Sequence, residues 1–91
     1  MNKTAIVTGG GRGIGYAIAL MLAENGYNIV VNYNSSQEAA EKLSEKIEKL
    51  GCKALAVKAN VGNFDESFKL INKAHSTFGR VDLLVNNAGI T

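Results

Sequence analysis

The sequence predicts an α/β fold of three layers, in which helices cover both faces of a parallel sheet. Short runs rich in Val, Ile and Leu alternate with longer helical segments, and a glycine follows each of those segments. Strands that are separated by helical crossovers pair in parallel, with right-handed connections. The predicted strands are Thr4–Thr8, Asn28–Tyr33, Lys53–Lys58 and Val81–Asn86.

The first two helices are predicted at Gly13–Asn25 and Ser36–Leu50. Asn-Gly stops the first helix, and Ser35 with Glu38 forms the pattern of a capping box at the start of the second. The spacing of apolar residues in the second helix predicts four core positions, Ala39, Leu43, Ile47 and Leu50.

A third helix is predicted to begin at Asn63, with Glu66 three residues later, and to end at Gly79. Its buried stripe is predicted to be Phe68, Ile71, Ala74 and Phe78. The order β-α-β-α-β-α-β is that of the first half of a doubly wound, Rossmann-type sheet with strand order 3-2-1-4. Residues 1–91 thus form one unit, whose ligand crevice is expected beyond the first and fourth strands, where the strand order reverses.

Composition excludes several classes of function. The net charge of +2 is dispersed along the chain, which argues against a nucleic-acid or acidic-membrane surface. The longest apolar run, Tyr16–Ala23, is too short to span a bilayer. Cys52 is the only cysteine, so no internal disulfide can form, which fits the cytoplasm. His75 has no cluster of metal-ligating residues around it and is expected on a helix surface.

A glycine-rich loop follows the first predicted strand and opens the first helix. Glycines let the backbone turn tightly and let a diphosphate approach the main-chain amides, and the helix N-terminus adds its positive dipole end. The alternative is a glycine-rich turn that binds no ligand. The loop reads Thr8-Gly9-Gly10-Gly11-Arg12-Gly13-Ile14-Gly15.

The spacing of this loop excludes two common phosphate-binding patterns. A Walker A loop requires Gly-Lys-Ser/Thr, whereas Gly15 is followed by Tyr16. The pattern Gly-x-Gly-x-x-Gly fails because Gly9 and Gly11 would require a glycine at Ile14. What fits is Thr-Gly-x-x-x-Gly-x-Gly.

That spacing, together with Asn86-Asn87-Ala88-Gly89 at the end of the fourth strand, resembles the short-chain dehydrogenase/reductase family over the whole chain. Within it, Arg-Gly-Ile-Gly, Val-Asn-Tyr and Asn-Asn-Ala-Gly-Ile-Thr look most like 3-oxoacyl-acyl-carrier-protein reductases and glucose dehydrogenases. The resemblance implies an oxidoreductase that moves hydride between a nicotinamide cofactor and a carbonyl or alcohol, usually as a homo-oligomer. It also implies that Asn87, Ala88 and Gly89 flank the ribose and nicotinamide.

The cofactor is predicted to be NADP(H). NAD sites carry an acid at the end of the second strand, whereas here Asn34 and Ser35 stand there and no carboxylate precedes Glu38. The resemblance places Arg12 where the family often has a base for the 2′-phosphate. Arg12 as a solvated surface residue and Ser35 as a simple helix cap are the alternatives.

The sequence departs from the family's pattern at two places: the position next to the adenine and the catalytic signature. Asn60-Val61 stands where the family usually has Asp-Val next to the adenine, and an amide can still bond to the adenine edge. The catalytic signature Tyr-x-x-x-Lys does not occur in residues 1–91, and the family's serine belongs to a later strand. The segment alone is therefore predicted to be inactive. A non-catalytic nucleotide-binding or sensor module, and a fragment that binds nothing, are the other hypotheses.

Overall fold

Four parallel strands and three helices make up the part of the chain that the structure, a computed structural model, describes: residues 2–10 and 13–87. They alternate as the sequence predicts, with ends that differ by a few residues. The strands are β1 (Thr4–Val7), β2 (Asn28–Tyr33), β3 (Ala54–Lys58) and β4 (Leu83–Val85). The helices are α1 (Gly13–Glu24), α2 (Gln37–Lys49) and α3 (Phe64–Phe78).

The strand order is β3-β2-β1-β4, which confirms the predicted sheet. Ile6 in β1 is level with Val30 in β2 on one side and Leu84 in β4 on the other. The chain thus runs outward from β1 to β3 and then returns to the opposite side of β1. The strand order reverses between β1 and β4, and this is where an open parallel sheet forms its ligand crevice.

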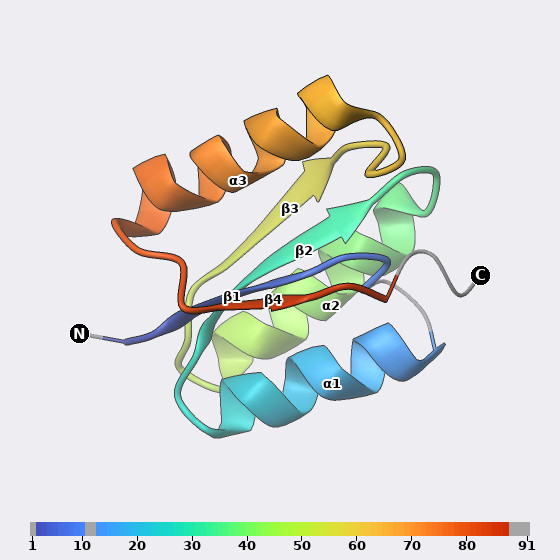
Figure 1. Ribbon diagram of the computed structural model, residues 1–91. Helices are drawn as coiled ribbons and strands as arrows, with labels where there is room; N and C mark the ends of the chain where they lie inside the picture. The colour runs from blue at the N-terminus through green and yellow to red at the C-terminus, as the bar shows by residue number, and fades with distance from the viewer. Residues whose placement is uncertain (1, 11–12, 88–91) are drawn as a thin grey trace.

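Helices cover both faces of the sheet, with α1 and α2 on one face and α3 alone on the other (Figure 1). Alternate residues of the central strands feed the two cores, as the two-residue period of a strand requires. Val7 and Val31 pack toward α1 and α2, in a cluster with Leu43 and Ile47. On the other face, Ile6 and Val30 share a smaller cluster with Ala59, Leu70 and Ala74.

The predicted core face of α2 is wrong at its two ends. Ala40 is fully buried with Leu43 and Ile47, whereas Leu50 follows the helix and is 48% exposed. The sequence has alanine at both 39 and 40, so periodicity alone does not choose between them. The predicted capping box is also wrong. The helix begins after Ser36, which makes no capping hydrogen bond with its side chain.

The predicted stripe of α3 is half wrong. Leu70 and Ala74 are buried and Phe78 is partly buried against them, whereas Phe68 is 58% and Ile71 43% exposed. Two apolar stripes are possible on this helix, and both contain Ala74 and Phe78. Only the stripe that contains Leu70 packs against the sheet. The predicted start is confirmed, because the Asn63 side chain accepts a hydrogen bond from the Glu66 amide.

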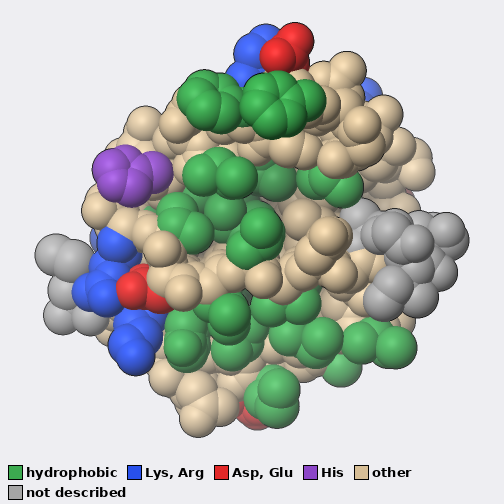
Figure 2. Space-filling view, in the orientation of Figure 1, with side chains coloured by type: hydrophobic (Ala, Val, Ile, Leu, Met, Phe, Trp, Pro, Cys, Tyr) green, Lys and Arg blue, Asp and Glu red, His purple; other side chains and the backbone are tan. Residues whose placement is uncertain are grey.

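Apolar side chains gather on the surface along β4 and over the outer sides of α3 and α1 (Figure 2). Leu84 of β4 is 51% exposed, as expected of a strand that is paired on one side only. His75 is exposed, as predicted, and Cys52 is buried. Within the described residues, no group of ligating side chains could hold a metal ion, and no helix has the length and hydropathy needed to cross a membrane.

Candidate functional site

The two sequence motifs meet at the carboxyl ends of β1 and β4. The Thr8 amide donates to the Val85 carbonyl at 3.0 Å, which continues the parallel pairing one step past β1. The Asn87 amide donates to the Thr8 hydroxyl at 2.8 Å, and that hydroxyl is itself 3.2 Å from the Val85 oxygen. The Thr8 and Asn87 side chains are buried, so the two motifs are joined by a dry network of neutral groups.

The turn after β1 leaves no space for a side chain where it meets α1. A Cβ atom on Gly15 would lie 2.6 Å from the Asn87 side-chain nitrogen and 2.7 Å from the Gly9 carbonyl oxygen, distances that no real contact shows. Gly9 has a φ of 63°, a backbone conformation that suits glycine. The Asn87 side-chain nitrogen donates to the Gly9 carbonyl oxygen at 3.4 Å. The spacing of the glycines thus brings the turn, α1 and the end of β4 into direct contact.

The start of α1 faces open space. A Cβ on Gly13 would meet nothing within 4 Å, and Ile14 is 65% exposed. The first N–H groups of a helix have no partner within it, and they carry the positive end of the helix dipole. The first turn of α1 has no acidic residue, whereas those of α2 and α3 do. An anion that binds here would meet uncompensated amides.

Four of the predicted site residues lie outside the part of the chain that the structure describes. They are Gly11, Arg12, Ala88 and Gly89. Their predicted contacts with the cofactor stay predictions.

Asn32 is a residue of this edge that sequence reasoning did not place in the site. Asn32 is polar but only 2% exposed, and it lies in a strand whose residues are otherwise mostly apolar. The side-chain nitrogen donates to the Ala59 carbonyl at 3.0 Å, and the side-chain oxygen accepts from the Gly9 amide at 3.4 Å. A polar residue in a buried strand, next to the end that points at the glycine turn, is the sequence signal that could have found it.

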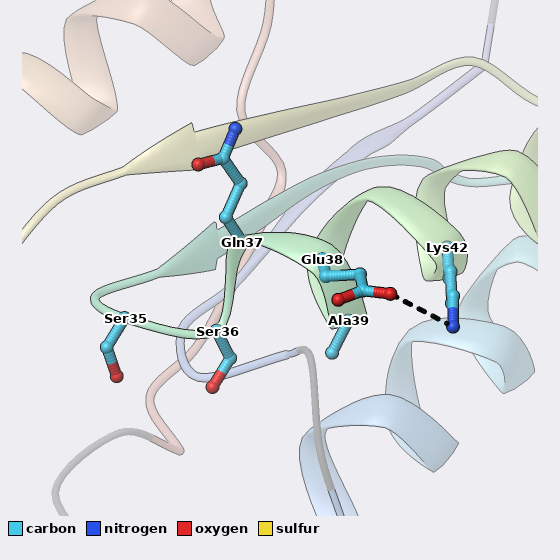
Figure 3. Close-up of a pocket in the computed structure, with 6 residues that line it drawn as sticks. All are labelled: Ser35, Ser36, Gln37, Glu38, Ala39 and Lys42. Atoms are coloured by element: carbon cyan, nitrogen blue, oxygen red, sulfur yellow. Dashed lines mark ion pairs between the residues drawn. The ribbon is translucent and has the colours of Figure 1, made fainter.

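The end of β2 opens into a hollow of about 470 Å³ at the start of α2 (Figure 3). Ser35 and Ser36 point to the same side of it, whereas Gln37 points away. Neither serine caps the helix through its side chain, so both hydroxyls and the first helix amides can face a ligand. Glu38 reaches Lys42, 3.4 Å away, in an exposed ion pair on the rim. Asn34 and Ser35 are exposed here, as a ligand contact requires.

The turn after β3 is held by the first turn of α3. The Asn60 amide donates to a Glu66 carboxylate oxygen at 2.8 Å, and the Asn60 side-chain oxygen accepts from Gly62 at 3.0 Å. Glu66 therefore fixes this turn, a role that its capping-box position indicated only in part. The backbone amide of Asn60 is thus bonded to Glu66, whereas its side-chain nitrogen makes no hydrogen bond to the described residues. Val61, next to it, is partly buried against the α3 core.

All the described candidates thus lie along one edge. Tyr33 at the end of β2 is level with Lys58 at the end of β3, so Asn34, Ser35, Asn60 and Val61 follow neighbouring strand ends. Gly9, Gly10, Gly13, Ile14, Gly15 and Asn87 stand beside them, at the ends of β1 and β4 and the start of α1. The edge thus combines a glycine turn, the start of a helix without an acid in its first turn, and a hollow lined by two serines with Glu38 and Lys42. An edge of this kind, where the strand order of a parallel sheet reverses, is where a nucleotide can bind.

Known proteins are similar to this chain over all or nearly all of its length. The model of the short chain dehydrogenase family matches residues 3–91. The chain is 54% identical over 91 residues to a 3-oxoacyl-acyl-carrier-protein reductase, FabG, of Staphylococcus epidermidis. It is 48% identical over 89 residues to a versicolorin reductase of Emericella nidulans. It covers 37% and 34% of those two proteins, so it spans about a third of the length of the curated relatives that it matches.

Solved structures give the same result for the fold. Acetoin dehydrogenase from Enterobacter cloacae superposes with a TM-score of 0.89 at 38% identity, over 96% of this chain and 34% of that one. The acetoin dehydrogenase YohF from Salmonella typhimurium gives 0.88 at 37% identity, over 96% of this chain and 36% of that one. The predicted resemblance is confirmed: the chain belongs to the short-chain dehydrogenase/reductase family and looks like the N-terminal part of a 3-oxoacyl-acyl-carrier-protein reductase.

Proposed function

We propose that this chain is the NADP(H)-binding N-terminal portion of a short-chain reductase. One observation carries the proposal: the glycine turn, the open start of α1 and the end of β4 meet where the strand order reverses. In this proposal the first amides of α1 bind the diphosphate, because those of Gly9 and Gly10 donate to Asn32. Gly15 allows the turn, α1 and the end of β4 to pack closely, and Asn87, Ala88 and Gly89 flank the ribose and nicotinamide. NADPH supplies the hydride when it is bound.

The hollow at the start of α2 is proposed to receive the adenosine ribose with its 2′-phosphate. Ser35, Asn34 and the first amides of α2 offer neutral donors, and no acid stands at the end of β2. Arg12 is proposed to pair with the same phosphate. Asn60 and Val61 would hold the adenine, with the side-chain nitrogen of Asn60 as donor.

The proposed substrate of the whole protein is a carbonyl compound such as a 3-oxoacyl thioester, or the corresponding alcohol. The support is the identity to the reductase of Staphylococcus epidermidis, whose name states that substrate. The parent protein is proposed to be a cytoplasmic homo-oligomer without nucleic-acid or membrane partners. The chain alone is proposed to be inactive, because residues 1–91 contain no Tyr-x-x-x-Lys.

Titration of the chain with NADPH and with NADH, followed by nicotinamide fluorescence, tests the proposal. NADPH should bind more tightly, and Arg12→Ala should weaken NADPH about tenfold while it spares NADH, as expected for one charge-assisted contact. Equal losses for both cofactors would show that Arg12 does not read the 2′-phosphate. Failure of both to bind at millimolar concentration would leave a fragment without a nucleotide site.

The same samples test the expected inactivity. Incubated with NADPH and a 3-oxoacyl thioester, the chain should leave the absorbance of NADPH unchanged over hours. Turnover would show that a proton donor other than the family's tyrosine operates within this chain.

A further inference from the structure

Asn32 connects three segments that the proposed site needs in register. Its side-chain oxygen is 3.4 Å from the Gly9 amide, and its own carbonyl accepts from the Gly10 amide at 3.2 Å. On the other side, its side-chain nitrogen is 3.0 Å from the Ala59 oxygen and 3.4 Å from the Val57 oxygen. One residue at the end of β2 therefore holds the turn after β1 and the end of β3.

These contacts are made in a dry environment. Asn32 is 2% exposed, and Ala59, which accepts its best hydrogen bond, is 4% exposed. A buried amide is costly unless its groups are paired, and here both the oxygen and the nitrogen have partners. The bonds at 3.0 Å and 3.4 Å set the separation between the glycine turn and the segment that leads to Asn60.

We propose that Asn32 is a positioning residue for nucleotide binding, which fixes the glycine turn relative to the end of β3 and touches no ligand itself. The inference rests on the proposed function, since it assigns the start of α1, which the turn leads into, to the diphosphate and Asn60 to the adenine. A dinucleotide contacts both segments at once, so its affinity depends on their spacing. Because the Gly9 amide is bonded to Asn32, it is directed into the protein and away from a ligand.

β2 also supplies a matched control. Asn28, at the other end of the strand, is 9% exposed, and its side-chain oxygen accepts from the Lys53 amide at 2.9 Å. It joins the same two strands, β2 and β3, but at the edge remote from the site. Asn28→Ala and Asn32→Ala therefore each remove a buried asparagine that links neighbouring strands.

The experiment compares the 91-residue chain with these two variants, by urea denaturation and by NADPH titration well below the unfolding midpoint. Both variants should lose stability. Asn32→Ala should weaken NADPH about tenfold, as expected when a buried hydrogen-bonded pair is lost, and Asn28→Ala less than twofold. The Gly9 amide resonance should shift and exchange faster in Asn32→Ala alone.

The outcomes separate the two proposals. If the unmodified chain binds no nucleotide, the proposed function fails, and this inference fails with it. If the unmodified chain binds and the folded Asn32→Ala binds equally well, the positioning role alone is overturned. Equal loss of affinity in both variants would likewise reduce Asn32 to a purely structural residue.

If Asn32→Ala does not fold, hydrogen exchange in the unmodified chain tests the same point. The side-chain amide protons of Asn32 should exchange far more slowly than those of Asn72, which is exposed on α3. NADPH should slow the exchange of the Asn32 side chain and the Gly9 amide together. Exchange of Asn32 that NADPH does not change would contradict the proposal.

Discussion

A buried threonine stands at each end of β1: Thr4 begins the strand and Thr8 follows it. The two hydroxyls differ in their hydrogen bonds. The Thr4 hydroxyl, at the amino end, has no hydrogen-bond partner within the described residues, although Thr4 is fully buried. The Thr8 hydroxyl, at the carboxyl end, accepts from the Asn87 amide and lies within bonding distance of the Val85 and Asn86 oxygens. The same residue type thus costs stability at one end and organises a network at the other.

The two ends also differ in charge. At the amino end, an Asp82 oxygen accepts from the Thr4 amide at 2.8 Å, and Arg80 binds both oxygens of that carboxylate. At the carboxyl end, the described network of Thr8, Asn32 and Asn87 consists of neutral groups only. The ion pair between Arg80 and Asp82 therefore lies at the amino end of β1, where it also holds the Thr4 amide. Neutral donors at the other end leave the potential of the α1 start unopposed for an anion.

The largest expected effect comes from Gly15→Ala at the carboxyl end. The added methyl group would overlap the Asn87 nitrogen and the Gly9 oxygen. The free energy of unfolding should fall by about 2–3 kcal/mol, and NADPH binding should be lost.

The control at the amino end is Gly26→Ala, whose φ is 89° and whose Cβ would meet nothing within 4 Å. Gly26→Ala should lower the free energy of unfolding by about 1 kcal/mol through backbone strain and leave NADPH binding unchanged. Urea denaturation and NADPH titration measure both variants. Equal effects of the two substitutions would show that the contact between the turn and β4 has no special weight.

The paired substitutions Thr4→Val and Thr8→Val sharpen the comparison directly. Thr8→Val leaves the Asn87 amide without its acceptor and should cost about 1–3 kcal/mol. Thr4→Val removes a buried, unpartnered hydroxyl and should raise stability by up to about 1 kcal/mol. Calorimetric melting temperatures would show the opposite signs, and a loss in both variants would contradict the contrast.

The charged end should respond to acid. The Arg80 guanidinium, and then the Thr4 amide, lower the pKa of Asp82 below its ordinary value. A lowered folded-state pKa gives stability that is present above the unfolded value of about 3.9 and is lost as pH falls toward the folded value. The unfolding midpoint in urea should therefore drop between pH 5 and pH 3, by less in Asp82→Asn. Equal slopes in the two proteins would exclude Asp82 as the cause.

The smallest effect is expected at the rim of the hollow. Glu38→Gln removes a negative charge beside Ser35 and Ser36 and frees Lys42 from its exposed ion pair. NADPH should bind about two- to fivefold more tightly at low salt, because exposed charges interact weakly and are screened. NADH, which lacks the 2′-phosphate, should bind unchanged. An equal gain in affinity for NADH would show that the 2′-phosphate does not bind in this hollow.

The sheet was predictable because glycines, strand-forming runs and helix lengths all give the same answer. The details of packing were not. Ala39 and Ala40 are equally apolar, as are Phe68 and Leu70, so only the shape of the sheet decides which of them is buried. Within the site, the pairing of the two motifs follows from strand order. The sequence could have marked Asn32 as a polar residue in a buried strand, but not its partners, because the Val57 and Ala59 carbonyls are distant in sequence.

Cys52 lies between the end of α1 and the start of β3, buried, with its sulfur 3.2 Å from the Ala23 oxygen. A thiol in that place can react with an alkylating reagent only in molecules in which this corner has opened. As the only cysteine of the chain, it reports such opening without any engineered label. The rate of its alkylation, with and without nucleotide, would show whether a ligand at the far edge of the sheet tightens the whole unit.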